Sequence, residues 1–268
     1  MIEVLIPRLV HFDSAVPNQP QWDTLIGICN PFTEAQVFEI HAFDMDGVEQ
    51  GSPLVYELVP GASMATTFIK WNVFENPPQN FGGYGKIIFP DKKTDTPFGN
   101  IPGLTLPVYC SLGGNGPTPM NWNYATPRVS LIGGLKTQNE RTIASRWVFP
   151  YSIPFFDDPK QHHDEHSYRS ALSITNLGKI QADLTIAFTR GDFYDNNSRK
   201  RFVTSITLAP GKSIAKYMHE LIPELLEMNQ EGWVDIMAAA PSDLIMYHID
   251  GSKGFDFQAF EQSPYVIG

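Results

Sequence analysis

The sequence has few basic residues, only two cysteines and no long apolar run. Nineteen Lys and Arg stand against 29 Asp and Glu, which gives a net charge of −10. Neither half of the chain carries the basic field that nucleic-acid binding needs, so we predict no nucleic-acid partner. The one tight basic cluster, Arg199 to Arg201, is expected at a solvated hairpin tip.

Targeting and membrane signals are also absent. No apolar stretch is long enough to span a bilayer, and Met1 to Val4 lack the basic start and apolar stretch of a signal peptide. The sequence therefore predicts no membrane span. By default it predicts a cytoplasmic location, with surface or virion assembly as the alternative.

The chain contains the same sequence pattern twice. Trp22 to Asn30 reads WDTLIGICN, and Tyr168 to Asn176 reads YRSALSITN. Val59 to Ser63 reads VPGAS, and Ala209 to Ser213 reads APGKS at the matching place. Self-similarity at this spacing predicts tandem copies of one domain rather than a short-period solenoid. We place copy one at residues 1–134 and copy two at residues 135–268.

Both copies show the two-residue periodicity of half-buried strands. The expected inward positions include Phe38, Ile40, Ala42, Leu184, Ile186 and Phe188. Turn signals such as Pro60-Gly61 and Pro210-Gly211 separate the strands. The pattern predicts an all-β fold of two tandem, internally duplicated antiparallel β-sandwich domains. One short helix is expected in the second domain, over residues 219–228 (HELIPELLEM).

The order of these elements resembles immunoglobulin-like β-sandwich repeats of bacterial surface and extracellular proteins of unassigned function. The residues that carry the resemblance are Asn30-Pro31, Ala35, Asp44 to Gly47, Pro60-Gly61, Asn176, Ala182, Pro210-Gly211, His219 to Leu226 and Gly232 to Ile236. Copy two lacks the Asp-Gly turn and copy one lacks the helical sequence. Members of such families share no catalytic residues, so the resemblance implies a scaffold.

The two cysteines follow the order of an immunoglobulin inter-sheet disulfide, since Cys29 falls in an early strand and Cys110 in a late one. The alternation of side chains along the first strand argues against that bond. Ile26 and Ile28 are the inward residues, so Cys29 is expected on the solvent-facing side of the strand. We therefore expect two reduced thiols. This favours either a reducing compartment or cysteines that have no specific role.

A possible metal site lies in the run His162-His163-Asp164-Glu165-His166. Imidazole and carboxylate groups suit a divalent metal such as Zn, Ni or Cu, and His162, His163, Asp164 and His166 are the candidate ligands. The alternative is a solvated loop before a strand, because no second ligand cluster stands at a recognised spacing. Asp44 to Glu49 begins like a calcium loop, but Val55 replaces the required Glu, and an Asp-Gly hairpin turn is predicted there instead.

A possible ligand-binding site lies in the loop from Gly113 to Thr126. Asn121, Trp122, Asn123 and Tyr124 combine rings that stack on sugars with amides that bind hydroxyl groups. The alternative is that the aromatic residues only pack. Trp122 and Tyr124 differ from the other aromatics in having no matching aromatic in copy two.

These patterns favour a non-enzymatic structural or interaction protein that assembles as a homo-oligomer or with another protein. No catalytic motif is found: Gly61 to Ala65, for example, lacks the final glycine of a nucleophile elbow. The first alternative is a carbohydrate- or ligand-binding module that uses the aromatics near Trp122. The second is a metal-dependent enzyme that uses the cluster at 162–166. Apart from that metal, no cofactor is expected.

Overall fold

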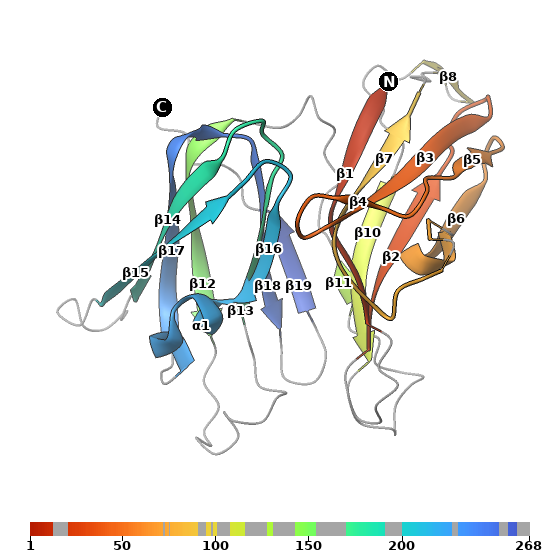
Figure 1. Cartoon of the computed structure of the whole chain (residues 1–268). Helices are drawn as coiled ribbons and strands as arrows, with labels where there is room; N and C mark the ends of the chain where they lie inside the picture. Colours follow the sequence, from red (N-terminus) through yellow and green to blue (C-terminus); the bar gives the residue numbers. More distant parts are fainter. Residues whose placement is uncertain are drawn as a thin grey trace. The chain divides into compact units, whose positions relative to one another are not determined.

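The computed structural model describes residues 1–12, 21–71, 73–74, 76–90, 95–97, 99–100, 108–115, 128–130, 143–153, 170–190, 200–226, 230–251 and 257–261. The chain divides into two compact units, Met1–Arg141 and Thr142–Gly268 (Figure 1). The boundary predicted between residues 134 and 135 lies outside the described residues.

The first unit is a sandwich of antiparallel strands. Its elements are β1 (Ile2–Phe12), β2 (Gln21–Cys29), β3 (Gln36–Asp44), β4 (Glu49–Gln50), β5 (Val55–Leu58), β6 (Ser63–Thr67), η1 (Phe68–Trp71), β7 (Asn80–Phe89), β8 (Asp95–Thr96), β9 (Gly99–Asn100), β10 (Val108–Asn115) and β11 (Arg128–Ser130). One layer runs β6-β2-β10-β11 and the other runs β1-β7-β3, with β4 and β5 sharing the outer edge of β3. The end of β1 joins the layers, because His11 and Phe12 pair with Asp23 and Trp22 of β2.

The second unit repeats this strand order. Its elements are β12 (Ala144–Ile153), β13 (Ser170–Asn176), β14 (Ala182–Arg190), β15 (Arg201–Leu208), β16 (Ser213–Tyr217), α1 (Met218–Leu221), η4 (Pro223–Leu226), β17 (Gln230–Ser242), β18 (Leu244–Gly251) and β19 (Phe257–Glu261). One layer runs β12-β17-β14-β15 and the other runs β16-β13-β18-β19. The prediction of an all-β fold of two antiparallel β-sandwiches is therefore confirmed.

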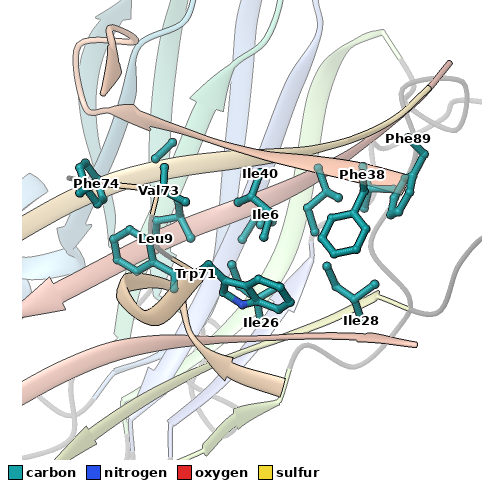
Figure 2. Close-up of a cluster of buried hydrophobic side chains, with 14 of the residues drawn as sticks. Ile6, Leu9, Ile26, Ile28, Phe38, Ile40, Trp71, Val73, Phe74 and Phe89 are labelled. Atoms are coloured by element: carbon teal, nitrogen blue, oxygen red, sulfur yellow. The ribbon is translucent and has the colours of Figure 1, made fainter. Parts of the chain in front are cut away.

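Each sandwich has its own apolar core, built from the inward positions of its strands. In the first, Ile6, Ile28 and Phe38 are fully buried, and Trp71 reaches the core from η1. Figure 2 shows the Trp71 ring lying among Phe38 and the isoleucines of β1, β2 and β3. In the second unit the buried tryptophan is Trp147 of β12. Its position in the sheet matches Val4 of β1, since Val4 pairs with Ile87 and Trp147 with Ile236.

The same buried asparagine closes the same turn in both units. In the first unit, Asn30 Nδ2 donates to the carbonyls of Glu34 and Leu58 at 2.8 Å, and Oδ1 accepts from Phe32 N at 3.0 Å. The Asn30 backbone bonds Ala62 O and Gly61 N, both at 2.9 Å.

In the second unit, Asn176 Nδ2 donates to Ile180 O at 2.8 Å and to Leu208 O at 2.9 Å, and Oδ1 accepts from Gly178 N at 2.9 Å. The Asn176 backbone bonds Lys212 O and Gly211 N. Gly61 and Gly211 follow the two turn prolines with φ of 73° and 77°, a conformation that favours glycine. The sequence duplication thus extends to individual hydrogen bonds.

The helix of the second unit is shorter than the sequence pattern predicts. The α-helical turn Met218–Leu221 ends at Ile222, whose backbone is extended at φ −138° and ψ 98°, and a 3-10 turn follows from Pro223. Proline lacks the N–H needed to continue an α-helix, and it disfavours helical geometry in the preceding residue. The first unit has the 3-10 turn η1 at the matching place after β6.

Cys29 carries a free thiol. Its strand β2 and the strand of Cys110, β10, are neighbours in one layer rather than members of opposite layers. Cys110 lies opposite Ile26, three residues along β2 from Cys29. That offset of roughly 10 Å along the strand exceeds the Cα separation that a disulfide permits.

Candidate functional site

The two clusters that the sequence singles out lie outside the described residues. Asn121, Trp122, Asn123 and Tyr124 fall between β10 and β11, and His162, His163, Asp164 and His166 fall between β12 and β13. The structure does describe the backbone of the strands that precede and follow the first of these clusters. Those strands define one end of the first sandwich, which is the candidate site.

Rows of paired residues cross this end of the sandwich. Asn115 pairs with Gln21, and Gly114 pairs with Trp22, which pairs in turn with Phe12. The next row runs from Gly113 through Asp23 to His11. The positions that flank the segment of Trp122 therefore include polar, aromatic and ionisable residue types.

The row of His11 exists because β1 bends from one layer toward the other. The register of β1 against β7 shifts between Ile6 and Leu9, and such a bulge bends a strand and increases its twist. Thr24 of β2 holds the bent part of β1 in place, because its Oγ1 accepts a hydrogen bond from Val10 N at 2.8 Å and donates one to Arg8 O at 3.3 Å. The buried hydroxyl of Thr24 thus sets where His11 and Asp23 meet.

The Arg8 side chain lies beside Met45 and Gly82. Its guanidinium Nη1 lies 2.8 Å from Met45 Sδ, and a Cβ added to Gly82 would lie 3.3 Å from Nη2. Glycine at position 82 therefore leaves the room that the guanidinium occupies. Burial lowers the pKa of Arg8 to about 10, which still leaves it cationic at neutral pH.

His11 and Asp23 form the ionisable pair of the site. His11 Nδ1 lies 3.5 Å from Asp23 Oδ2, and the two side chains are 17% and 32% exposed. Burial raises the pKa of Asp23, while the nearby His11, the backbone of Thr24 and the side chain of Thr67 oppose that rise. Asp23 Oδ1 has no hydrogen-bond partner among the described residues.

This arrangement supplies polar groups that can recognise a ligand. A half-buried imidazole and carboxylate can donate to and accept from a hydroxyl or amide group. Asp23 Oδ1 is a hydrogen-bond acceptor without a partner among the described residues, and the hydroxyl group of a bound ligand could donate to it. Sequence reasoning missed the pair because His11 and Asp23 belong to different strands, and only the register of β1 on β2 brings them together.

A second histidine cluster lies on the outer face of the β7-β3 layer. His41 Nδ1 lies 2.6 Å from Glu49 Oε1, and His41 Nε2 lies 3.2 Å from Glu39 Oε2. The two carboxylates occupy opposite ring nitrogens, so they do not converge on a point where one ion could bind all three groups. Within the part of the chain that the structure describes, no group of three or more metal-binding side chains is found.

The Asp-Gly segment forms the predicted turn. Asp44 Oδ1 accepts from the backbone N–H groups of Asp46 and Val48, both at 2.9 Å, and Oδ2 accepts from Gln50 Nε2 at 2.7 Å. Gly47 has φ of 78°, as expected at an Asp-Gly turn. Both carboxylate oxygens of Asp44 are used to hold the hairpin.

None of the helices in the described ranges is both long and apolar enough to cross a membrane.

Comparison with known proteins yields no family assignment. No family model and no curated protein matches the sequence. Among solved structures, Thermotoga maritima 1070 is similar over 46% of this chain and 97% of its own, with 19% identity and a TM-score of 0.34. Bacteroides uniformis beta-glucuronidase 2 is similar over 92% of this chain and 26% of its own, with 9% identity and a TM-score of 0.19. The PBSX exported protein XepA covers 91% of this chain and 84% of its own, with 11% identity and a TM-score of 0.20.

Proposed function

We propose that this chain is a non-enzymatic structural or interaction protein that assembles with copies of itself. The proposal rests on one observation, the edge of the second sandwich. There the eight-residue strand β15 pairs with β14 on one side, and no strand among the described residues pairs with its other side. An exposed edge strand presents unpaired N–H and C=O groups and is a template for another chain.

One further feature of this edge supports an assembly role. Val203 of β15 is 57% exposed, so the edge carries an apolar contact as well as backbone groups. The buried asparagines Asn30 and Asn176 have their polar atoms engaged in closing turns. These groups stabilise the two sandwiches, and the function is assigned to a surface rather than to a reactive centre.

The first test is the mass of the full chain in solution, measured by light scattering coupled to size-exclusion chromatography over a range of concentrations. We expect a multimer whose mass is a whole multiple of the chain mass. A monomer at every concentration would refute the assembly proposal.

A second candidate function is recognition of a glycan or another polar ligand at the end of the first sandwich. Its support is the His11–Asp23 pair in the row next to the root of the segment that contains Trp122. Glycan-array binding that is lost in both Trp122→Ala and Asp23→Ala would favour it. Binding that survives both substitutions, or none at all, would remove it.

A further inference from the structure

β15 is the longest uninterrupted edge strand in the described part of the chain. The other edge of its layer, β12, contains Pro150 and a register shift between Ala144 and Arg146. Proline and bulges protect an edge against pairing. In the first sandwich, the eleven-residue β1 is an outer strand too, but it contains Pro7 and a register shift between Ile6 and Leu9. The other outer strands are short, with five residues in β16, β19 and β6, four in β5, three in β11 and two in β4. The eight residues of β15 have neither proline nor a register shift against β14.

The two faces of β15 limit how another strand can join it. Exposed and more buried residues alternate along the strand, and Phe202 and Ile206 pack against the core while Val203 faces outward. Residues directly opposite in an antiparallel pair share a face. A second copy of β15 must therefore pair inward positions with inward positions, which permits every second register.

We infer, building on the proposed homo-oligomer, that β15 pairs antiparallel with β15 of a second copy around a two-fold axis at Thr204. In this register Phe202 of one copy lies opposite Ile206 of the other, and Val203 lies opposite Ser205. The two layers become one continuous sheet, and the same residues are used on both sides of the axis, as a two-fold interface requires.

Charge complementarity selects this register. Arg201 of the second copy lies opposite Thr207, and Thr207 Oγ1 donates to Asp183 Oδ1 on the neighbouring strand at 2.9 Å. Gln181 Nε2 donates to the same oxygen at 2.9 Å, and Oδ2 accepts neither bond. The backbones of Asp183 and the second copy's Arg201 are two strand spacings apart, roughly 9.5 Å. An extended arginine can close that gap, and the axis creates two such ion pairs.

The test compares two lysine substitutions at exposed valines on edge strands. Val203→Lys places two lysines diagonally across the axis, close enough to repel each other. Val55→Lys introduces the same charge on β5, an edge strand of the first sandwich. Val203 is 57% exposed and Val55 is 65% exposed, so neither change removes a core contact. We expect Val203→Lys to raise the dimer dissociation constant at least about tenfold and Val55→Lys to leave it unchanged, both measured on the full chain by light scattering.

Charge exchange tests the register itself. Arg201→Glu and Asp183→Lys should each weaken the dimer, and the double variant should restore it. Circular dichroism on each variant checks that the fold is intact. Restoration supports the Thr204 register, and failure to restore overturns it. A multimer that Val203→Lys leaves unchanged would overturn the β15 interface while keeping self-assembly, and a wild-type monomer would overturn both.

Discussion

The two sandwiches have matching hydrogen bonds in their turns but different strands at the edges of their sheets. Asn30 and Asn176 make matching sets of hydrogen bonds. The outer edge of β3 in the first unit is divided between the four residues of β5 and the two of β4, whereas β14 in the second carries the unbroken β15. The comparison teaches that the hydrogen bonds that close the turns are repeated, while the strands at the sheet edges are not.

The largest expected effect comes from replacing the turn-closing asparagine that both sandwiches share. In Asn176→Asp a carboxylate would face the carbonyls of Ile180 and Leu208, so two donors are lost and acceptors oppose each other. We expect a loss of at least about 3 kcal/mol in the free energy of unfolding, measured by urea denaturation. Hydrogen exchange should locate the loss in residues 142–268.

Asn30→Asp is the matched variant in the first unit, and its loss should be similar in size but located in residues 1–141. A loss below about 1 kcal/mol in both variants would show that these asparagines do not hold the turns.

A moderate effect is expected from a pair whose charges are reversed between the units. Arg146 Nε and Nη2 donate to Asp235 Oδ1 and Oδ2, both at 2.9 Å, while Lys86 reaches Glu3 through one contact of 3.4 Å. Asp235→Asn should cost about 1–2 kcal/mol, because the two-point bond to a charged group is lost. Lys86→Met should cost less than about 1 kcal/mol. Urea denaturation measures both, and equal losses would contradict this ranking.

The smallest effect concerns Asp23, whose aligned residue in copy two is Arg169, outside the described residues. Burial raises the pKa of Asp23 in the folded protein, so the folded state binds this proton more tightly than the unfolded state. The ionised carboxylate therefore lowers stability at neutral pH, and the penalty is relieved as the pH falls through the folded pKa toward 3.8.

Asp23→Asn should accordingly raise the melting temperature at about pH 7 and raise it less at about pH 4. Thermal unfolding at the two pH values measures the difference. A gain that grows as the pH falls would show that the ion pair with His11 outweighs burial.

The fold was predictable where one strand determines which face a residue occupies. The inward positions Phe38, Ile40, Leu184 and Ile186 are all buried, because two-residue alternation is a local property. The helix over residues 219–228 was predicted too long, because the effect of Pro223 on Ile222 was underestimated.

The candidate site could not be found in the same way. His11 meets Asp23 only after a bulge carries β1 from one layer to the other, and nothing in the local pattern marks that crossing. The role of Asn30 was hidden for a similar reason, since Leu58, whose carbonyl it binds, is 28 residues away. A useful signal was present, since the same asparagine occurs before the same turn in both copies.

The reversed ion pairs have a consequence for folding fidelity. Adjacent domains of similar sequence are prone to exchange strands while both are incomplete. If β1 docked on β17 in place of β12, Glu3 would stand beside Asp235, and if β12 docked on β7, Arg146 would stand beside Lys86. Like charges at these positions repel. Because the charges are reversed between the copies, β1 and β12 each form a favourable ion pair only within their own domain. A chain in which these two strands are exchanged is therefore less stable.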